Sequence, residues 1–134
     1  MKILLIDDDL VSLEILKIFL NKPEYEVYAY SNAEEAIDEV RKTNFDLVIT
    51  DIIMPGMTGI DFIKDMWSHG IRPPIITITA GPEDVEDEQE AYVHFGSIFA
   101  DESLAKPVSK EDLLKAVVKL TTPHKNNTEL GDTE

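Results

Sequence analysis

The sequence contains no cysteine among its 134 residues. This absence excludes disulfide bonds, thiolate metal sites and cysteine nucleophiles. Basic residues are also scarce, since 12 lysines and arginines stand against 27 acids and give a formal net charge of −15. Because phosphate backbones and anionic membranes are bound by clustered lysine and arginine, we expect this chain to bind neither nucleic acid nor membrane directly. The charge instead favours cations and basic protein surfaces as partners.

Long apolar runs are missing as well. The longest spans only a few residues, which is too short to cross a bilayer. The first apolar stretch reaches Asp7 too early to serve as a secretory signal, so we expect a cytoplasmic protein. The hydrophobic content of 43% is nevertheless that of a globular chain, and 134 residues are enough for one domain with a real core.

Apolar and amphipathic segments alternate five times along the chain. Continuous apolar or alternating runs predict strands, and apolar residues three or four apart predict helices. We expect strands over 2–6, 26–30, 45–50, 74–79 and 97–100, the last with an extension to Leu104 left open. The expected helices cover 10–20, 33–43, 60–67, 83–95 and 109–120.

Apolar strands that are separated by helices indicate a parallel sheet covered on both faces. With right-handed crossovers, the chain is expected to form a doubly wound α/β sandwich with five parallel strands, a (βα)5 flavodoxin-like fold. Residues 1–121 would form this domain. Residues 122–134 lack periodicity and apolar bulk, and we interpret them as a disordered tail or a truncated linker.

Polar side chains follow several of the predicted strands. Asp7 and Asp8 follow the first strand, Asp51 follows the third, Thr79 ends the fourth, and Lys106 follows the fifth. In an open parallel sheet, the ligand site lies beyond the carboxyl ends of the strands. We therefore expect these five residues to meet at one edge of the sheet.

Three carboxylates in one cleft repel one another unless a cation joins them. A hard divalent ion with oxygen ligands and retained waters is suitable, which favours Mg²⁺. One carboxylate can then approach a phosphoryl group, whose charge the metal and Lys106 would share. Thr79 can donate a hydrogen bond to a phosphoryl oxygen. With a carboxylate as nucleophile, the product would be an aspartyl phosphate.

Four segments, LLIDDDL, VITDIIMPGMTGID, ITITA and LAKP, resemble the receiver domain of two-component response regulators over residues 2–121. Each motif is weak alone, but the four in order, each at the end of a predicted strand, form a specific set. The resemblance implies that Asp51 is the phospho-accepting aspartate. It also implies that Asp8 is the more direct metal ligand of the acidic pair and that Asp7 acts largely through water.

The same resemblance assigns further positions. Ile53 matches the residue whose backbone carbonyl binds the metal, and Thr79 matches the switch hydroxyl. Ala80 matches the small residue beside that threonine. Lys106 matches the phosphate-binding lysine, and Pro107 matches the proline that commonly follows it through a cis bond.

The chain departs from the receiver pattern between the fourth and fifth strands. Ser103 occupies the position where receivers usually carry Tyr or Phe, three residues before Lys106. The segment from Thr79 to Lys106 is also longer than usual, by about one helical turn. Phe99 would supply the missing ring if the register is shifted, and Tyr92 is a remoter candidate. The usual coupling of threonine to an aromatic ring is therefore open.

The resemblance implies that the chain catalyses its own phosphorylation and dephosphorylation at Asp51, which is not the activity of a conventional enzyme. The phosphodonor would be a sensor histidine kinase or a phosphotransfer protein, with small phosphodonors as alternatives. An output domain or a protein target would read the phosphorylated state, and a weak or phosphorylation-dependent homodimer is a further expectation. The acidic run 83–90 either selects a basic partner and weakens self-association, or is a solvated helix start favoured by the helix dipole.

Other classes of protein share parts of this pattern. A haloacid-dehalogenase-type phosphatase places a second aspartate two residues after its nucleophile, where this chain has Ile53. A dinucleotide-binding protein would have a glycine-rich loop after the first strand, and none is present. A receiver-fold interaction module that does not depend on phosphorylation remains the alternative. Asp7 and Asp8 could also simply end a strand, and Asp9 is expected only to cap the next helix.

Overall fold

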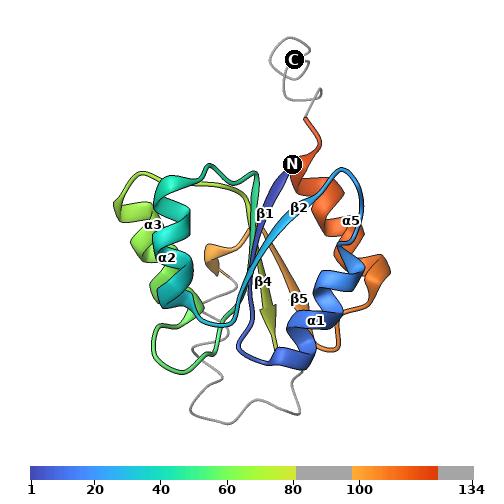
Figure 1. The fold of residues 1–134 in the computed structure, drawn as a ribbon, viewed down its shortest axis with the longest axis horizontal. Helices are drawn as coiled ribbons and strands as arrows, with labels where there is room; N and C mark the ends of the chain where they lie inside the picture. Colours follow the sequence, from blue (N-terminus) through green and yellow to red (C-terminus); the bar gives the residue numbers. More distant parts are fainter. Residues whose placement is uncertain (81–97, 124–134) are drawn as a thin grey trace.

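The computed structural model describes residues 1–80 and 98–123 (Figure 1). Within these residues the strands are β1 (Lys2–Ile6), β2 (Glu26–Tyr30), β3 (Leu47–Asp51), β4 (Ile75–Thr79) and β5 (Glu102–Ala105). The helices are α1 (Leu10–Phe19), α2 (Ala33–Lys42), α3 (Gly59–Ser68) and α5 (Lys110–Thr121). The predicted fourth helix, 83–95, and most of the predicted tail lie outside the described residues.

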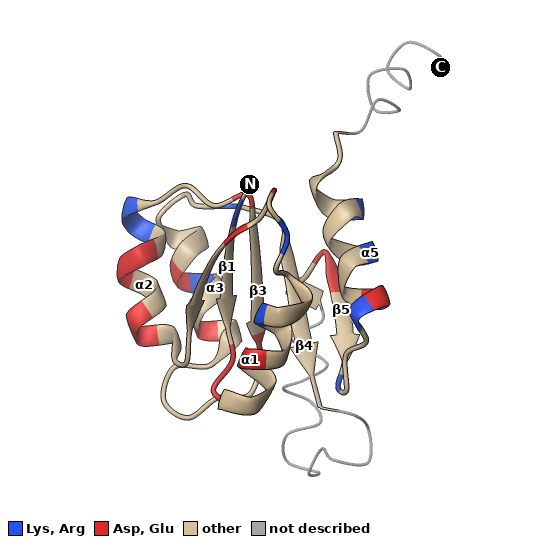
Figure 2. Ribbon diagram, turned by 45° about the vertical axis from the view of Figure 1, so that its right-hand side comes forward, with Lys and Arg blue, Asp and Glu red and all other residues tan. Residues whose placement is uncertain are grey.

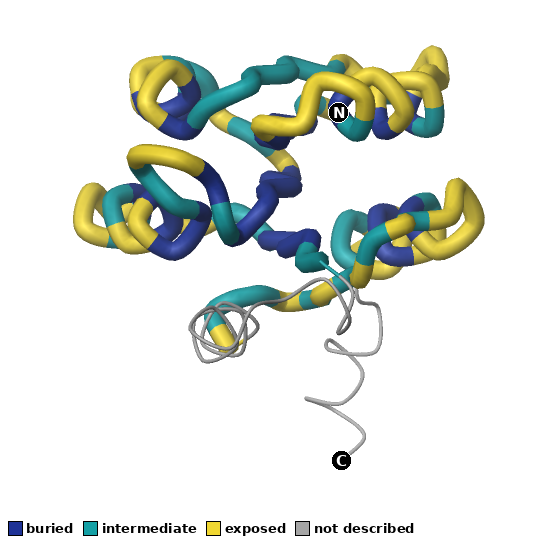
Figure 3. The backbone as a smooth tube through the Cα atoms, turned by 90° about the horizontal axis from the view of Figure 1, so that it is seen from below, coloured by how far each residue is buried: buried dark blue, intermediate teal, exposed yellow. Residues whose placement is uncertain are grey.

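All five strands run parallel in one sheet, in the order β2-β1-β3-β4-β5. Helices α1 and α5 cover one face of this sheet, and α2 and α3 cover the other (Figure 1). The predicted doubly wound α/β fold of the flavodoxin type is therefore confirmed. Figure 3 shows buried central strands with helices on either side, whose outer turns are exposed.

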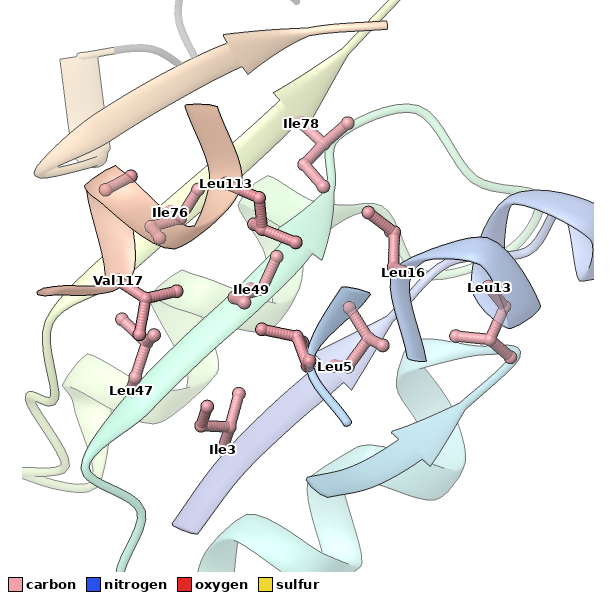
Figure 4. Packing of buried hydrophobic residues seen from close by; sticks show 12 residues of the cluster. Ile3, Leu5, Leu13, Leu16, Leu47, Ile49, Ile76, Ile78, Leu113 and Val117 are labelled. Carbon is pink, nitrogen blue, oxygen red and sulfur yellow. The ribbon is translucent and has the colours of Figure 1, made fainter. Parts of the chain in front are cut away.

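The core consists of two clusters, one on each face of the sheet. Alternate side chains of a strand point to opposite faces, so Ile49 packs with Leu16 and Leu113 while its neighbour Val48 packs with Phe62. Figure 4 shows the first cluster, where side chains from β1, β3 and β4 meet those of α1 and α5. Burial on both faces explains why the central strands consist mostly of apolar residues.

The loop between β1 and α1 carries the three consecutive aspartates of the sequence, at the carboxyl edge of the sheet (Figure 2). Asp9 is the N-cap of α1, and its side chain accepts hydrogen bonds from the N–H groups of Val11 and Ser12. The prediction that Asp9 caps this helix is confirmed. Asp7 and Asp8 are thus left for another role.

The strand predicted at 97–100 is wrong. Residues 98 and 99 are helical, and β5 begins only at Glu102. Asp101 sets this start: its N–H donates to the Ile75 carbonyl at 2.9 Å, and its carboxylate accepts the Ile75 N–H at 2.8 Å. The pairing of β5 with β4 then begins at Glu102, which lies opposite Ile76.

Of the large apolar residues in the mistaken strand, Phe99 packs against a helix, whereas Ile98 is exposed. The Phe99 ring meets the Trp67 ring of α3 edge-on, with a centroid distance of 5.5 Å and an interplanar angle of 68°. The Arg72 guanidinium lies 5.0 Å from the centroid of the same Trp67 ring. The hydrophobicity of Phe99 therefore serves packing on the α3 face of the sheet.

Candidate functional site

The strand register aligns the predicted site residues at one edge of the sheet. Ile6 pairs with Thr50, so Asp7 and Asp51 leave adjacent strands at the same level. Thr79 pairs with Ala105, which places Lys106 just beyond the next strand. The Lys106 N–H donates to the Thr79 carbonyl at 2.7 Å and extends this pairing by one residue.

Lys106 joins the two buried carboxylates. Its Nζ lies 3.1 Å from Asp51 Oδ2 and 3.4 Å from Asp7 Oδ1. The peptide bond from Lys106 to Pro107 is cis, as the resemblance implied. The lysine is therefore positioned to balance negative charge at Asp51.

Asp7, Asp8 and Asp51 form the acidic cluster that the sequence predicted. One oxygen from each carboxylate lies within 4.8 Å of the others, and Asp8 is exposed while Asp7 and Asp51 are buried. Asp7 Oδ1 accepts the Asp9 N–H at 2.9 Å. Asp7 Oδ2 is buried and accepts no hydrogen bond within the described residues, although Lys106 Nζ lies 3.4 Å from it.

The residues present fit a divalent cation. A buried carboxylate oxygen without a hydrogen bond is costly, and a cation would satisfy it. Three carboxylates, one of them open to solvent, suit Mg²⁺, which binds few protein oxygens and keeps several waters. Ile53, whose carbonyl the resemblance assigns to the metal, lies half-buried in the loop directly after Asp51.

The pKa shifts of Asp51 and Lys106 are consistent with a divalent cation at this site. Burial, and then the negative charge of Asp7, raise the pKa of Asp51 to about 8, although Lys106 acts in the opposite direction. Burial alone would lower the pKa of Lys106, but the charges of Asp51 and Asp7 outweigh it and raise that pKa. Asp51 therefore does not ionise readily at neutral pH without additional positive charge.

Thr79 and Ala80 are half-buried at the end of β4, the strand beside Asp51. The structure thus places every residue of the predicted acceptor, metal and lysine set at one sheet edge. Their roles in phosphoryl transfer and switching stay predictions.

Phe99 was predicted to supply the missing aromatic ring only if the strand register were shifted. The register of β5 against β4 is not shifted. Ser103 pairs with Thr77 and stands three residues before Lys106. Its hydroxyl forms a 2.8 Å hydrogen bond with the Thr77 hydroxyl, while Phe99 packs against Trp67. Tyr92 lies outside the described residues.

Two features of the site were missed by the sequence reasoning. Thr77 is a fully buried hydroxyl that the sequence analysis did not single out, although a polar residue among buried isoleucines is a signal for a polar partner. Glu34 accepts the Met57 N–H across 23 positions, and a first-turn acid in a helix gives no sign of such a contact.

The fold and the site together define a class of protein: a parallel α/β domain that gathers three carboxylates and a lysine at the carboxyl edge of its sheet. A family model described as the response regulator receiver domain matches residues 3–118. The chain belongs to the response regulator receiver domain family, and with it to two-component signalling by phosphoryl acceptance.

Curated relatives include regulators of the cell cycle. The cell cycle transcriptional regulator CtrA of Caulobacter vibrioides is 28% identical over 127 residues, which cover 92% of this chain and 53% of the relative. The cell cycle response regulator CtrA of Brucella ovis is 27% identical over 117 residues, which cover 87% of this chain and 48% of the relative. The chain therefore spans about half the length of these curated relatives.

Solved structures of receivers are similar over most of both chains. The response regulator TrrA from Thermotoga maritima, solved in complex with Mg²⁺-BeF, is 31% identical with a TM-score of 0.72, covering 89% of this chain and 97% of that chain. The chemotaxis protein CheY4 of Vibrio cholerae is 29% identical with a TM-score of 0.70 and the same two coverages. In the described part of this chain, every helix is too short or too polar to cross a bilayer.

Proposed function

We propose that this receiver accepts a phosphoryl group on Asp51 from a phosphohistidine of a sensor histidine kinase or phosphotransfer protein, in a Mg²⁺-dependent reaction. The observation that carries the proposal is the contact of Asp51 with Lys106 beside Asp7 and Asp8. Asp51 supplies the nucleophile, and Lys106 supplies a fixed positive charge. The acidic cluster supplies a site for Mg²⁺. A receiver solved with Mg²⁺-BeF supports the same arrangement by analogy.

The chemistry assigns each group a task. An Asp51 carboxylate oxygen attacks phosphorus, the P–N bond breaks, and the histidine nitrogen keeps the electron pair. The Lys106 ammonium pairs with the phosphoryl oxygens, and the Thr79 hydroxyl donates to one of them. Mg²⁺ held by Asp7, Asp8, Asp51 and the Ile53 carbonyl would supply the positive charge that keeps Asp51 ionised and offsets the charge on the phosphoryl group.

The surface beside the acceptor is suited to a protein phosphodonor. Helix α1 exposes apolar side chains, with Val11 69% and Ile15 43% exposed. A groove of about 280 Å³ lies along this helix, and its lining includes Val11 and Ile15 together with Lys106 and Pro107. A helix of the donor that covers this apolar surface would bring its phosphohistidine near Lys106 and Asp51.

Phosphorylation would then change how a protein target or output domain binds, with Thr79 as the first residue to respond. Helix α5 ends at Thr121, which supports residues 1–121 as the domain. The alternative, an interaction module independent of phosphorylation, is favoured by Ser103 at the aromatic position. Equal affinity for a partner with and without a phosphoryl mimic would favour the alternative.

The direct test is intact-mass measurement after incubation with Mg²⁺ and acetyl phosphate. We expect a labile addition of one phosphoryl group, which chelation of the metal prevents and Asp51→Asn abolishes. Failure to label the wild-type chain, or undiminished labelling of Asp51→Asn, would contradict the proposal.

A further inference from the structure

The loop between β3 and α3, residues 52–58, contains the carbonyl of Ile53 that the family resemblance assigns to the metal. Backbone contacts fix the end of this loop, because the Gly59 N–H donates to the Ile52 carbonyl at 2.8 Å. Gly59 also packs against the Asp51 carbonyl so closely that a Cβ there would overlap this oxygen. Helix α3 therefore starts directly against the backbone of the acceptor.

A second contact holds the middle of the loop from another element. The Met57 N–H donates to Glu34 Oε2 at 3.0 Å. The same carboxylate lies against Gly56, where φ is +75° and an added Cβ would meet Glu34 Oε2 at 2.5 Å. The positive φ favours glycine at this position, and any larger residue would also displace the Glu34 carboxylate.

Glu34 is supported by a rigid element. It lies in the first turn of α2, where the Asn32 side chain caps the helix by accepting the Glu35 N–H at 2.8 Å. Ala33 and Ala36 bury the same end of the helix against the sheet, and α2 lies beside α3 (Figure 1). A charged acceptor on a packed helix holds a backbone N–H more firmly than a loop side chain would.

We propose that Glu34 is a positioning residue for the metal site: its carboxylate fixes residues 52–58, and with them the Ile53 carbonyl, relative to Asp51. Glu34 acts through Met57 and Gly56 and touches none of the reacting groups. The inference rests on the proposed function, because it requires a Mg²⁺ site at the acidic cluster of Asp7, Asp8 and Asp51. Loss of the anchor should weaken metal binding while every metal ligand stays in place.

The test compares Glu34→Ala with Glu35→Ala in the full chain. Glu35 is exposed in the same helical turn, and its side chain forms no hydrogen bond within the described residues, so both variants lose the same charge near the site. Two readouts are needed: hydrogen exchange of the Met57 amide without metal, followed by NMR, and the Mg²⁺ dissociation constant from calorimetry. Glu34→Gln and Glu35→Gln form a second matched pair in case the alanine variant does not fold.

We expect Glu34→Ala to exchange the Met57 amide about tenfold faster than Glu35→Ala and to bind Mg²⁺ about fivefold more weakly. Glu34→Gln, which keeps a neutral acceptor, should show smaller changes in the same direction. Unchanged exchange, or faster exchange with the affinity of the Glu35 control, would overturn the inference. If the wild-type chain itself takes up no Mg²⁺, the proposed function fails, and this is seen before any variant is compared.

Discussion

Lys106 Nζ lies 3.1 Å from Asp51 Oδ2, although the two residues are 55 positions apart and leave strands that are not neighbours in the sheet. The contact spans β4, whose end pairs with both β3 and β5. The lysine thus supplies the only positive charge within hydrogen-bonding distance of the two buried carboxylates among the described residues.

Replacing Lys106 with alanine should slow the phosphorylation of Asp51 by acetyl phosphate about 100-fold, because a fixed positive charge at the phosphoryl oxygens is lost. The rate can be followed by intact mass with saturating Mg²⁺. Lys110→Ala, which removes an exposed lysine from the start of α5, is the control and should label at the wild-type rate. Equal rates for the two variants would show that Lys106 does not act on the phosphoryl group.

Without metal, the stability of the protein should fall as pH rises from about 4 to about 8. The pKa of Asp51 is raised from 3.8 to about 8, chiefly by burial, so in this range the folded state holds a proton that the unfolded state has lost. Folding is therefore favoured below this range, and the contribution is lost as pH rises through about 8. Urea unfolding in a chelating buffer measures the slope.

Asp51→Asn should flatten that pH dependence, and Mg²⁺ should oppose it in the wild-type chain, because the metal binds the ionised carboxylate. Metal affinity should accordingly increase with pH up to about 8. A wild-type slope that is the same with and without Mg²⁺ would contradict this account of the site.

Gly59→Ala should destabilise the protein by about 1–3 kcal/mol, since the added Cβ would overlap the Asp51 carbonyl. Gly70→Ala is an informative comparison: φ there is +74°, but an added Cβ would meet nothing within 4 Å. It should cost only about 1 kcal/mol, from backbone strain alone. Denaturant unfolding would contradict the assignment if Gly59→Ala were the milder of the two changes.

The Thr77–Ser103 hydroxyl pair should show strong coupling in a double-mutant cycle. Ser103→Ala leaves the buried Thr77 hydroxyl without this partner and should cost about 1–3 kcal/mol. Adding Thr77→Val removes the stranded hydroxyl, so the double variant should be less destabilised than the sum of the single variants. Strictly additive free energies of unfolding would mean that the hydrogen bond contributes nothing.

The apolar surface of α1 can be tested with Val11→Glu, at a side chain that is 69% exposed. The change should slow transfer from a histidine phosphodonor protein at least about tenfold, because it places a charge in an apolar contact. Labelling by acetyl phosphate should stay at the wild-type rate, since Asp51 and Lys106 are untouched. Equal slowing with both donors would place the effect at the acceptor rather than at a docking surface.

Much of the fold and the site could be predicted because burial and position were visible in the sequence. The strand KILLI is followed directly by Asp7, and the strand LVITD ends in Asp51, and parallel topology brings such strand ends to one edge. The cluster of Asp7, Asp8 and Asp51 follows from that rule. The spacing of these three residues along the chain does not by itself give the distances between their side chains.

The features that were predicted wrongly or missed have local physical causes. In β5, the sequence ESLA has one large apolar residue, whereas Phe99, which precedes the strand, packs on Trp67. The pairing of Asp101 with Ile75, which sets the strand start, is a side-chain contact that no periodicity reveals. The bond from Met57 to Glu34 is hidden for a similar reason, because a glutamate in a first helical turn already has a sufficient local explanation.

The ring contact between Trp67 and Phe99 has a practical consequence. Trp67 is the single tryptophan of the chain, and its indole lies between the Arg72 guanidinium and the Phe99 ring. Its emission spectrum is therefore an intrinsic, label-free optical probe of the surface where α3 meets the residues before β5. A shift in that emission on phosphoryl transfer would reveal that the signal reaches the far end of α3, and an unchanged spectrum would show that the surroundings of Trp67 do not respond.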